Sequence, residues 1–350
     1  MTSSQDVPQQ TVRPGAEQEV LSSSPETTDL MDVNVSNNSE QDLESQNQPL
    51  LNDKPEGSTI HETDVNENEC LILPRVALTD LALGEEIARG TFGKVRRAQW
   101  LGTDVAVKET DVKRMKFTKP IIIQELKIHS KIRHPNIIQL MAYTTEKNKL
   151  YMILELNDGK NLEEVIFDDH EGIIPLDIKM EITRSVIKAV AYLHNQSPPI
   201  IHMDIKPENV LVSRELKRIR LCNLGISKLK TMNSSISTSM GSLQPGTLAY
   251  QAPEVFMNQS SATSYSDIWS TGCTILELFT EMPAWSIPPD DDLGAYILTR
   301  MKDCHPPDAM QAFLSIFPEN CKFKEIIRMA LSYDAKNRPS ALELLSNCCL

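Results

Sequence analysis

The stretch "IIHMDIKPENVLV", residues 200–212, is the strongest motif in this chain of 350 residues. Two apolar runs enclose a polar centre in which His202, Asp204, Lys206 and Asn209 follow one another in a fixed order. A short motif is by itself a weak guide to function, and its structural context has to agree with it. The interpretation therefore depends on the motifs on either side of this stretch.

The sequence before this stretch changes from strand-like to helical patterns. "TDVAVKE" (103–109) has period two, so Ala106 and Lys108 share one face of the expected strand. "KPIIIQELKIHSKIRH" has helical spacing, and "LYMILEL" is an apolar run of strand length followed by the turn "DGKN". In residues 176–194 apolar side chains recur at intervals of three and four. The order predicts a small strand-rich half (about 79–154) and a larger helical half (about 160–350).

Two features of the strand-rich half suggest phosphate binding. "EIARGTFGKV" has Ala88, Gly90 and Gly93 at the positions of a G-x-G-x-x-G loop, where backbone N–H groups can approach phosphates without obstruction. An ordinary hairpin turn would explain the same glycines. Lys108 faces the same way as Ala106, and a lysine on an inward face needs an anionic partner. Glu125, on the expected helix, is the candidate.

Composition separates an acidic tail from a neutral folded part. Residues 1–74 hold 15 acidic and 2 basic residues and no Phe, Trp or Tyr, whereas the remaining 33 acidic and 33 basic residues cancel. Low hydrophobicity with high net charge predicts that 1–74 is disordered, and we favour a solubilising role over a docking role. The balanced charge of the rest gives no reason to expect nucleic acid binding. No apolar run is long enough to span a membrane, and seven scattered cysteines suggest reduced thiols and a cytoplasmic location.

With these segments, the central stretch resembles the catalytic loop of eukaryotic protein kinases. "GTLAYQAPE" (246–254) is similar to the end of a kinase activation segment, and "SDIWSTGC" (266–273) to the start of the central helix, with Asp267 as a buried anchor. "NRPSALELL" is similar to the terminal helix region, where Arg338 would pair with Glu254. The lead-in "WLG" before "VAVK" suggests the tyrosine-kinase-like branch, which includes receptor-interacting and Raf-type kinases.

The resemblance implies an α+β fold with two lobes. It places a small antiparallel sheet and one helix in an N-lobe at 79–154, a hinge at 155–159 and a mainly helical C-lobe at 160–350. ATP, Mg²⁺ (with Mn²⁺ possible) and protein substrates or signalling partners follow from the same resemblance. The resemblance implies catalytic roles for Asp204 as proton acceptor, for Lys206 at the γ-phosphate, and for Lys108 at the α- and β-phosphates with Glu125 holding it. It implies nucleotide contacts, with Leu154 as gatekeeper, for Ala88, Gly90, Gly93, Val95, Ala106, Leu211 and residues Glu155 to Asn157. It implies metal contacts for Asn209 and Asn223.

Three positions depart from the family pattern. Ala88 replaces the first loop glycine, and Met203 replaces an arginine that receives a phosphate on the activation segment in kinases switched on by phosphorylation. Asn223, in "RIRLCNLGISKL", replaces the aspartate that supplies both an oxygen ligand and a negative charge to Mg²⁺. A carboxamide keeps the oxygen but not the charge, so this sequence predicts a weakened metal site.

Two functional classes remain open. The first is a slow serine/threonine kinase, favoured by Lys108, Asp204 and Lys206, with Lys206 and Thr247 indicating a serine/threonine acceptor. The second is a pseudokinase that binds nucleotide or partners as a scaffold, favoured by Asn223 and Met203. A kinase of small molecules is disfavoured by the complete "GTLAYQAPE" segment, which forms a peptide-docking ledge in protein kinases. We expect the enzyme, because the proton-accepting and phosphate-handling groups all survive.

Overall fold

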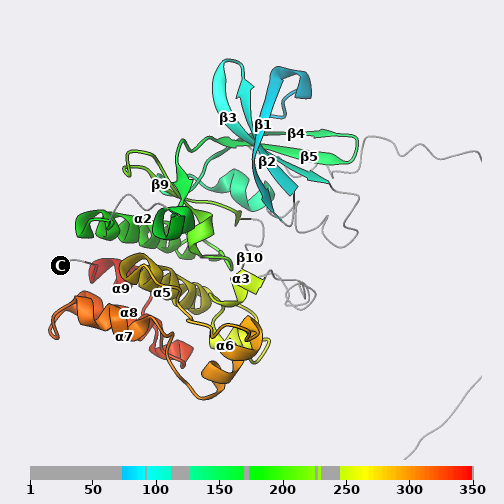
Figure 1. Cartoon of the computed structure of the whole chain (residues 1–350). Helices are drawn as coiled ribbons and strands as arrows, with labels where there is room; N and C mark the ends of the chain where they lie inside the picture. Colours follow the sequence, from blue (N-terminus) through cyan, green and yellow to red (C-terminus); the bar gives the residue numbers. More distant parts are fainter. Residues whose placement is uncertain are drawn as a thin grey trace, which may run out of the picture. The chain divides into compact units, whose positions relative to one another are not determined.

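The computed structural model describes residues 73–90, 93–111, 126–168, 173–224, 228–229 and 245–348 (Figure 1). All of them lie in the second of the two units into which the chain divides, Val65–Leu350. The disorder predicted for 1–74 falls outside these ranges except at Leu73 and Pro74. Leu73 is buried against the first sheet with Leu140 and Leu150, so the packed part begins at or before this residue.

The N-lobe is built on one antiparallel sheet of five strands. Its order is β1-β2-β3-β5-β4, so each strand lies beside at least one neighbour in sequence and the hairpin connections stay short (Figure 1). Val105 and Val107 point to one face and pack with Tyr151 and Ile153, as the period-two pattern predicts. The strands are β1 (Leu81–Gly90), β2 (Gly93–Trp100), β3 (Thr103–Asp111), β4 (Leu140–Glu146) and β5 (Lys149–Glu155), preceded by the turn η1 (Leu78–Asp80).

The β1–β2 hairpin closes where the glycine loop was predicted. Gly90 pairs with Gly93 across the hairpin. Gly93 has φ +146°, and a Cβ placed on it would lie 2.1 Å from the carbonyl oxygen of Glu109 in β3. Around Gly90, by contrast, no atom of the described residues outside its immediate neighbours lies within 4 Å of the corresponding position. Gly93 is therefore required for strand packing as well as for any contact with a ligand.

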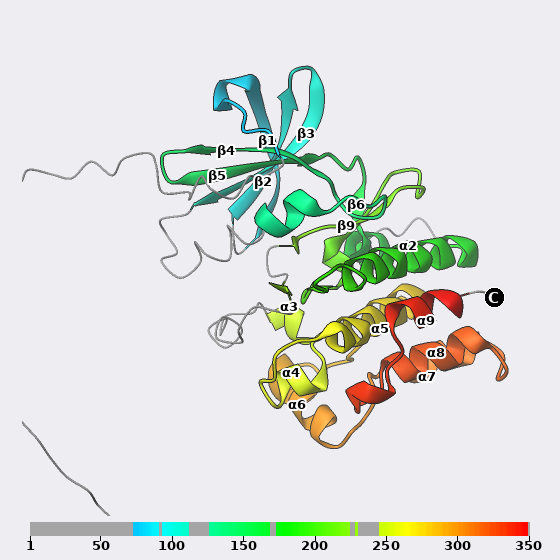
Figure 2. The same cartoon turned by 180° about the vertical axis from the view of Figure 1, so that it is seen from behind.

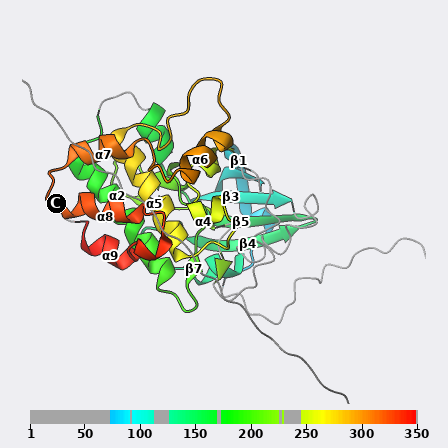
Figure 3. The same ribbon diagram turned by 90° about the horizontal axis from the view of Figure 1, so that it is seen from below.

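The C-lobe is a set of helices around α5 (Figures 2 and 3). Helix α2 spans Leu176–His194, as the apolar stripe predicted. Helix α5 begins with a capping box at Thr263, and at Gly272 the side chain of Leu331 packs where a Cβ would clash. Besides α2, the described helices of this lobe are α3 (Pro245–Leu248), α4 (Pro253–Phe256), α5 (Ser264–Thr280), α6 (Leu293–Lys302), α7 (Met310–Ile316), α8 (Lys322–Ala330) and α9 (Ala341–Ser346). The short elements are the π-helix η2 (Glu164–Asp168) and the 3₁₀ helices η3 (Pro207–Asn209) and η6 (Ala335–Asn337).

Short strands join the two lobes and carry the catalytic loop. "DGKN" was predicted as a turn, but Lys160 and Asn161 form β6, because they pair with Val212 and Leu211 of β8. Figure 2 shows β6 and β9 near α2. Backbone bonds from Ile138 to Leu221 and from Leu221 to Asn136 connect β9 to the N-lobe (2.9 and 2.8 Å). The short strands are β6 (Lys160–Asn161), β7 (Ile200–Ile201), β8 (Val210–Val212), β9 (Ile219–Leu221) and β10 (Lys228–Leu229).

The predicted α+β fold with two lobes is confirmed: an antiparallel sheet forms the smaller lobe and helices the larger. Of the helix predicted over 119–134, residues 126–134 are described: 126–131 are helical, and 132–134 are not. Within the ranges that the structure describes, no helix is long and apolar enough to cross a membrane.

Candidate active site

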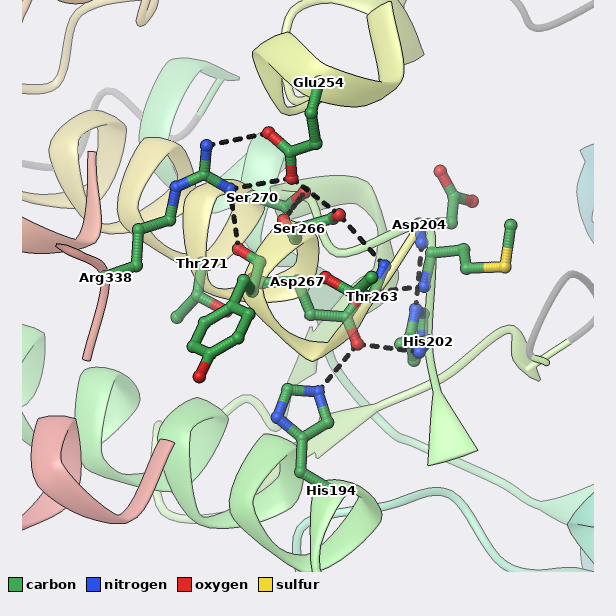
Figure 4. Close-up of polar contacts among 12 residues, drawn as sticks. His194, His202, Asp204, Glu254, Thr263, Ser266, Asp267, Ser270, Thr271 and Arg338 are labelled. Atoms are coloured by element: carbon green, nitrogen blue, oxygen red, sulfur yellow. Dashed lines mark hydrogen bonds and ion pairs between the residues drawn. The ribbon is translucent and has the colours of Figure 1, made fainter. Parts of the chain in front are cut away.

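The loop after β7 is held in place by one buried carboxylate, Asp267, in the first turn of α5 (Figure 4). Asp267 accepts hydrogen bonds from the backbone N–H groups of His202 (2.8 Å) and Met203 (2.9 Å) and from Nε2 of His194 (2.9 Å). Met203 has a positive φ of 70°, a conformation that a non-glycine residue keeps only when its surroundings impose it. The prediction that Asp267 is a buried anchor is confirmed.

His202 connects this loop to the strand that leads to Asn223. Its Nδ1 accepts the N–H of Asp204 at 3.2 Å, and its Nε2 donates to the carbonyl of Cys222 at 3.1 Å. Burial lowers the pKa of His202, although the negative charges of Asp267 and Asp204 act in the opposite direction. A neutral imidazole with its hydrogen on Nε2 satisfies both bonds. His202 therefore fixes Asp204 and the residue before Asn223 relative to each other.

Asp204 is buried, and one of its two carboxylate oxygens has a hydrogen-bond partner among the described residues. Asn209, in η3, donates through Nδ2 to Oδ2 of Asp204 at 2.8 Å and to its carbonyl at 2.7 Å. Oδ1 of Asp204 has no hydrogen-bond partner within the part of the chain that the structure describes. An unsatisfied buried carboxylate oxygen is unfavourable, so it calls for a partner from outside, such as a hydroxyl group or a cation.

Lys206 is also buried, and two residues orient its ammonium group. It donates to Oγ1 of Thr247, in helix α3, at 3.0 Å and forms an ion pair with Glu208. The pKa of the nearby Glu163 is raised by burial and by the negative charge of Glu208. The sequence predicted a link between Lys206 and Thr247 but not the role of Glu208. The only signal for Glu208 was an acidic residue two positions after Lys206 in the same motif.

Asn223 lies between the lysine of β3 and the catalytic loop. Its Oδ1 accepts from Nζ of Lys108 at 3.4 Å, and its Nδ2 faces Oδ2 of Asp204 and Oδ1 of Asn209, each at 3.4 Å. All three contacts are long, which makes them weak. An aspartate here would place a second carboxylate beside Asp204, so the carboxamide lowers the negative charge of the site.

The nucleotide-contact residues proposed from the resemblance come from strands β1, β2, β3, β5 and β8 and from the residues that follow β5. The sheet register places Val95 opposite Lys108 and Ala106 opposite Leu154, so these four side chains share one face of the sheet. The carboxamide of Asn157 donates to the carbonyl of Val212 in β8 (3.3 Å), so the hinge lies beside the strand that carries Leu211. Ala88 of β1 pairs with Val95 of β2. The N–H of Glu155 is bonded to the carbonyl of Gln139 at 2.9 Å.

One predicted residue, Glu125, the proposed partner of Lys108, falls outside the part of the chain that the structure describes. Across the described ranges, no group of three His, Cys, Asp or Glu side chains is placed to hold a metal ion. A cation in this site would therefore depend on carboxamide oxygens as well as on Asp204.

Two ion-pair and hydrogen-bond clusters support the segment after α3. The predicted pair of Glu254 and Arg338 is confirmed, with contacts of 2.9 and 2.8 Å, and Ser266 donates to the same carboxylate (Figure 4). A second cluster was not found from the sequence. Tyr250 donates its hydroxyl to buried Glu277 at 2.7 Å, and Glu277 also accepts the N–H of Ala284 at 2.8 Å.

Glu277 should make stability depend on pH. Burial is the main reason that its pKa rises from 4.5 to about 7, despite the two hydrogen bonds that it accepts. The folded protein then holds a proton that the unfolded chain releases, so stability falls as pH rises from about 4.5 to about 7. Glu277→Gln keeps one acceptor for Ala284 and one donor for Tyr250. We expect the free energy of unfolding of the wild type, relative to this variant, to fall by about 2 kcal/mol between pH 5.5 and pH 8.

Denaturant titrations of both proteins at the two pH values measure this difference. If the two unfolding free energies change in parallel, Glu277 is not protonated in the folded state at pH 5.5, and the assignment is wrong.

Comparisons with known proteins agree with this geometry. Residues 81–348 match the family model described as a protein kinase domain. A probable serine/threonine-protein kinase of Dictyostelium discoideum is 31% identical over 273 residues, which are 75% of this chain and 41% of that protein. Serine/threonine-protein kinase CTR1 of Arabidopsis thaliana is 33% identical over 211 residues (59% and 25%). A human SNF-related serine/threonine-protein kinase is 29% identical over 265 residues (75% and 32%). The matched part is less than half the length of each of these relatives.

Proposed function

Because this chain belongs to the protein kinase family, we propose that it transfers the γ-phosphoryl group of ATP to serine or threonine hydroxyls of proteins, with a weakened metal site. The observation that carries the proposal is the buried carboxylate of Asp204, whose Oδ1 has no partner among the described residues and whose Oδ2 is held by Asn209. That arrangement suits a group that accepts a proton from a substrate hydroxyl.

The other residues position and neutralise phosphate. Lys206 is fixed by Thr247 and Glu208 beside Asp204, where its positive charge can offset charge on the transferred group. Lys108 projects from the sheet face that carries Ala106 and Val95, which suits a contact with the α- and β-phosphates below a bound adenine. We propose the same division into N-lobe, hinge and C-lobe as the sequence suggested, with Glu125 as the partner of Lys108.

The kinase family implies a divalent cation, generally Mg²⁺. The donor set fits one: Asn209 and Asn223 offer carboxamide oxygens beside the negative charge of Asp204. A bound cation would supply positive charge beside the phosphates. With one carboxylate instead of two, Mn²⁺ should be preferred over Mg²⁺, since it is less demanding of geometry.

Several observations favour a serine/threonine acceptor and the tyrosine-kinase-like branch. The Lys206–Thr247 bond is the contact from which the acceptor class was predicted. All three relatives are named as serine/threonine-protein kinases. The "WLG" lead-in to "VAVK" remains the sequence feature that indicates the branch.

A pseudokinase scaffold is the second candidate, and the contacts of Asn223 favour it. Its amide nitrogen faces Oδ1 of Asn209, which a cation would use, and Oδ2 of Asp204. A cation must then displace a carboxamide that already serves as a donor. In this reading the chain binds nucleotide with little or no dependence on Mg²⁺ and does not transfer phosphate.

Asn223→Asp separates the two candidates. The added charge beside a divalent cation should raise Mg²⁺-dependent transfer at least tenfold, which requires only ~1.4 kcal/mol of transition-state stabilisation. A radiolabelled ATP transfer assay on a generic basic protein measures the rate. Adding Asp204→Asn should abolish the gain, because no group would then accept the hydroxyl proton.

Asn347→Asp is the matched control, since it adds the same charge after α9, away from the site. It should leave the rate unchanged. If Asn223→Asp binds Mg²⁺-ATP but transfers nothing, and the wild type is equally inactive, the enzyme proposal is wrong and the scaffold takes its place.

A further inference from the structure

Arg220, in β9, lies three residues before Asn223 and reaches back to the hinge. Its Nη2 donates to Oε1 of Glu155 at 3.0 Å, and its Nε donates to Oε2 at 3.3 Å. This is a two-point contact between a planar guanidinium and a carboxylate, which fixes the orientation of both groups. The two side chains are 18% and 31% exposed, so water screens the pair only in part.

The same guanidinium makes a third contact. Its Nη1 donates to the carbonyl of Pro135, in the loop before β4. The next residue, Asn136, accepts the N–H of Leu221 at 2.8 Å and donates its carboxamide to the carbonyl of Ile219 at 3.0 Å. Arg220 therefore stands at a junction of three segments: β9, the end of β5 and the loop at 135–136.

This junction controls the first residue of the hinge. The N–H of Glu155 is bonded to the carbonyl of Gln139 at 2.9 Å, and its side chain is held by Arg220, so both sides of this residue are fixed. Without Arg220, the half-buried carboxylate of Glu155 would lose its charge partner and would turn towards water. The backbone at Leu156 and Asn157 would then be less restrained, because the conformation of the preceding residue, Glu155, would no longer be fixed.

A neighbouring ion pair, Arg218 with Asp158, is more exposed to solvent and serves as a comparison for the Arg220–Glu155 pair. Arg218, two residues before Arg220, contacts Asp158 of the hinge through one hydrogen bond of 3.2 Å. These side chains are 56% and 47% exposed, so the pair should contribute little. Both pairs join the same two segments, but only the Arg220 pair is bidentate and partly buried.

We propose that Arg220 is a positioning residue for the nucleotide: it fixes the hinge at Glu155 relative to the strand that leads to Asn223. The inference rests on the proposed function insofar as the hinge receives the adenine of ATP. It assigns Arg220 no contact with the nucleotide. Its effect should appear in nucleotide affinity and not in the rate of the transfer step.

The test compares Arg220→Gln, Arg220→Lys and the control Arg218→Gln in the full chain. Calorimetry gives the Kd for Mg²⁺-ATP, and hydrogen exchange without nucleotide reports on the hinge amides. We expect Arg220→Gln to weaken ATP binding about five- to tenfold and to speed hinge exchange, with kcat at saturating ATP within about twofold of the wild type. Arg220→Lys should lie between these values, and Arg218→Gln should match the wild type.

The double variant Arg220→Gln/Glu155→Gln should bind ATP no more weakly than Arg220→Gln alone, because both substitutions break one pair. Equal Kd values for Arg220→Gln and Arg218→Gln would overturn the inference, as would a fall in kcat with Kd unchanged. Wild-type protein that binds ATP without transferring phosphate would refute the enzyme proposal alone, since Kd and hydrogen exchange would still decide the role of Arg220.

Discussion

Asp204→Asn is expected to lower phosphoryl transfer about a thousandfold, within the range for removing a general base. Asparagine has nearly the same shape and can still accept a hydrogen bond from Asn209, as Asp204 does at 2.8 Å. It cannot take the proton of a hydroxyl group. The loss should therefore appear in kcat, and the Kd for ATP should change by less than about threefold.

The radiolabelled transfer assay used for Asn223→Asp measures this loss. Asp308→Asn is a matched control, because Asp308 is also largely buried and accepts bonds from Arg300 and Tyr296 (2.5 and 2.9 Å), but it lies by α6. Its rate should equal that of the wild type. If Asp204→Asn keeps more than a tenth of the wild-type rate, Asp204 is not the proton acceptor, and the unsatisfied Oδ1 needs another explanation.

Arg338→Met should destabilise the fold by about 3–5 kcal/mol, as expected when one partner of a buried ion pair is removed. The side chain of Arg338 is 0% exposed, so methionine fills its volume but leaves the carboxylate of Glu254 without a charge partner. Burial by itself would raise the pKa of Glu254, but the hydrogen bond and charge of Arg338, with help from Ser266, lower it overall. The lowered pKa indicates that the folded protein holds Glu254 ionised.

Thermal unfolding measures the effect, with an expected fall in Tm on the order of 10 °C. Arg328→Met, in α8, is the control, since Arg328 is 61% exposed and pairs with exposed Glu325; its Tm should change by about 2 °C or less. The double variant Arg338→Met/Glu254→Gln should recover much of the loss, because no buried charge remains. If the double variant is as unstable as Arg338→Met, lost packing and not an unpaired charge explains the effect.

Local patterns predicted much of the fold. The stripe of apolar residues predicted helix α2 over Leu176–His194, and period-two alternation predicted which face of β3 carries Lys108. Both signals depend on residues a few positions apart, where geometry is set by the backbone alone. The motif resemblance added pairs far apart in sequence, such as Glu254 with Arg338, because the family pattern places both residues together.

Other contacts could not be predicted in this way. Arg220 and Glu155 are separated by 65 positions, and nothing in the local pattern of β9 indicates which way Arg220 points. Tyr250 and Glu277 are in contact because helix α5, which carries Glu277, packs against the segment after α3. Such pairs depend on how elements pack against one another, which periodicity does not encode. The sequence showed that Asn223 departs from the aspartate of the family pattern, but only the structure shows that its amide donates towards Asp204.

The hairpin glycines have a consequence for how sequences of this type are screened. A search for active kinases often counts glycines in this loop as a sign of nucleotide binding. At Gly93, however, any side chain would collide with the backbone of β3, so selection for folding alone would preserve this glycine in an inactive protein. At Gly90 the described residues leave space for a Cβ, so strand packing constrains this position less than it constrains Gly93. In a library of variants selected for stability, substitutions should accumulate at Gly90 and be absent at Gly93. A glycine at position 90 is therefore evidence of nucleotide binding, whereas a glycine at position 93 is evidence only that the sheet packs in this way.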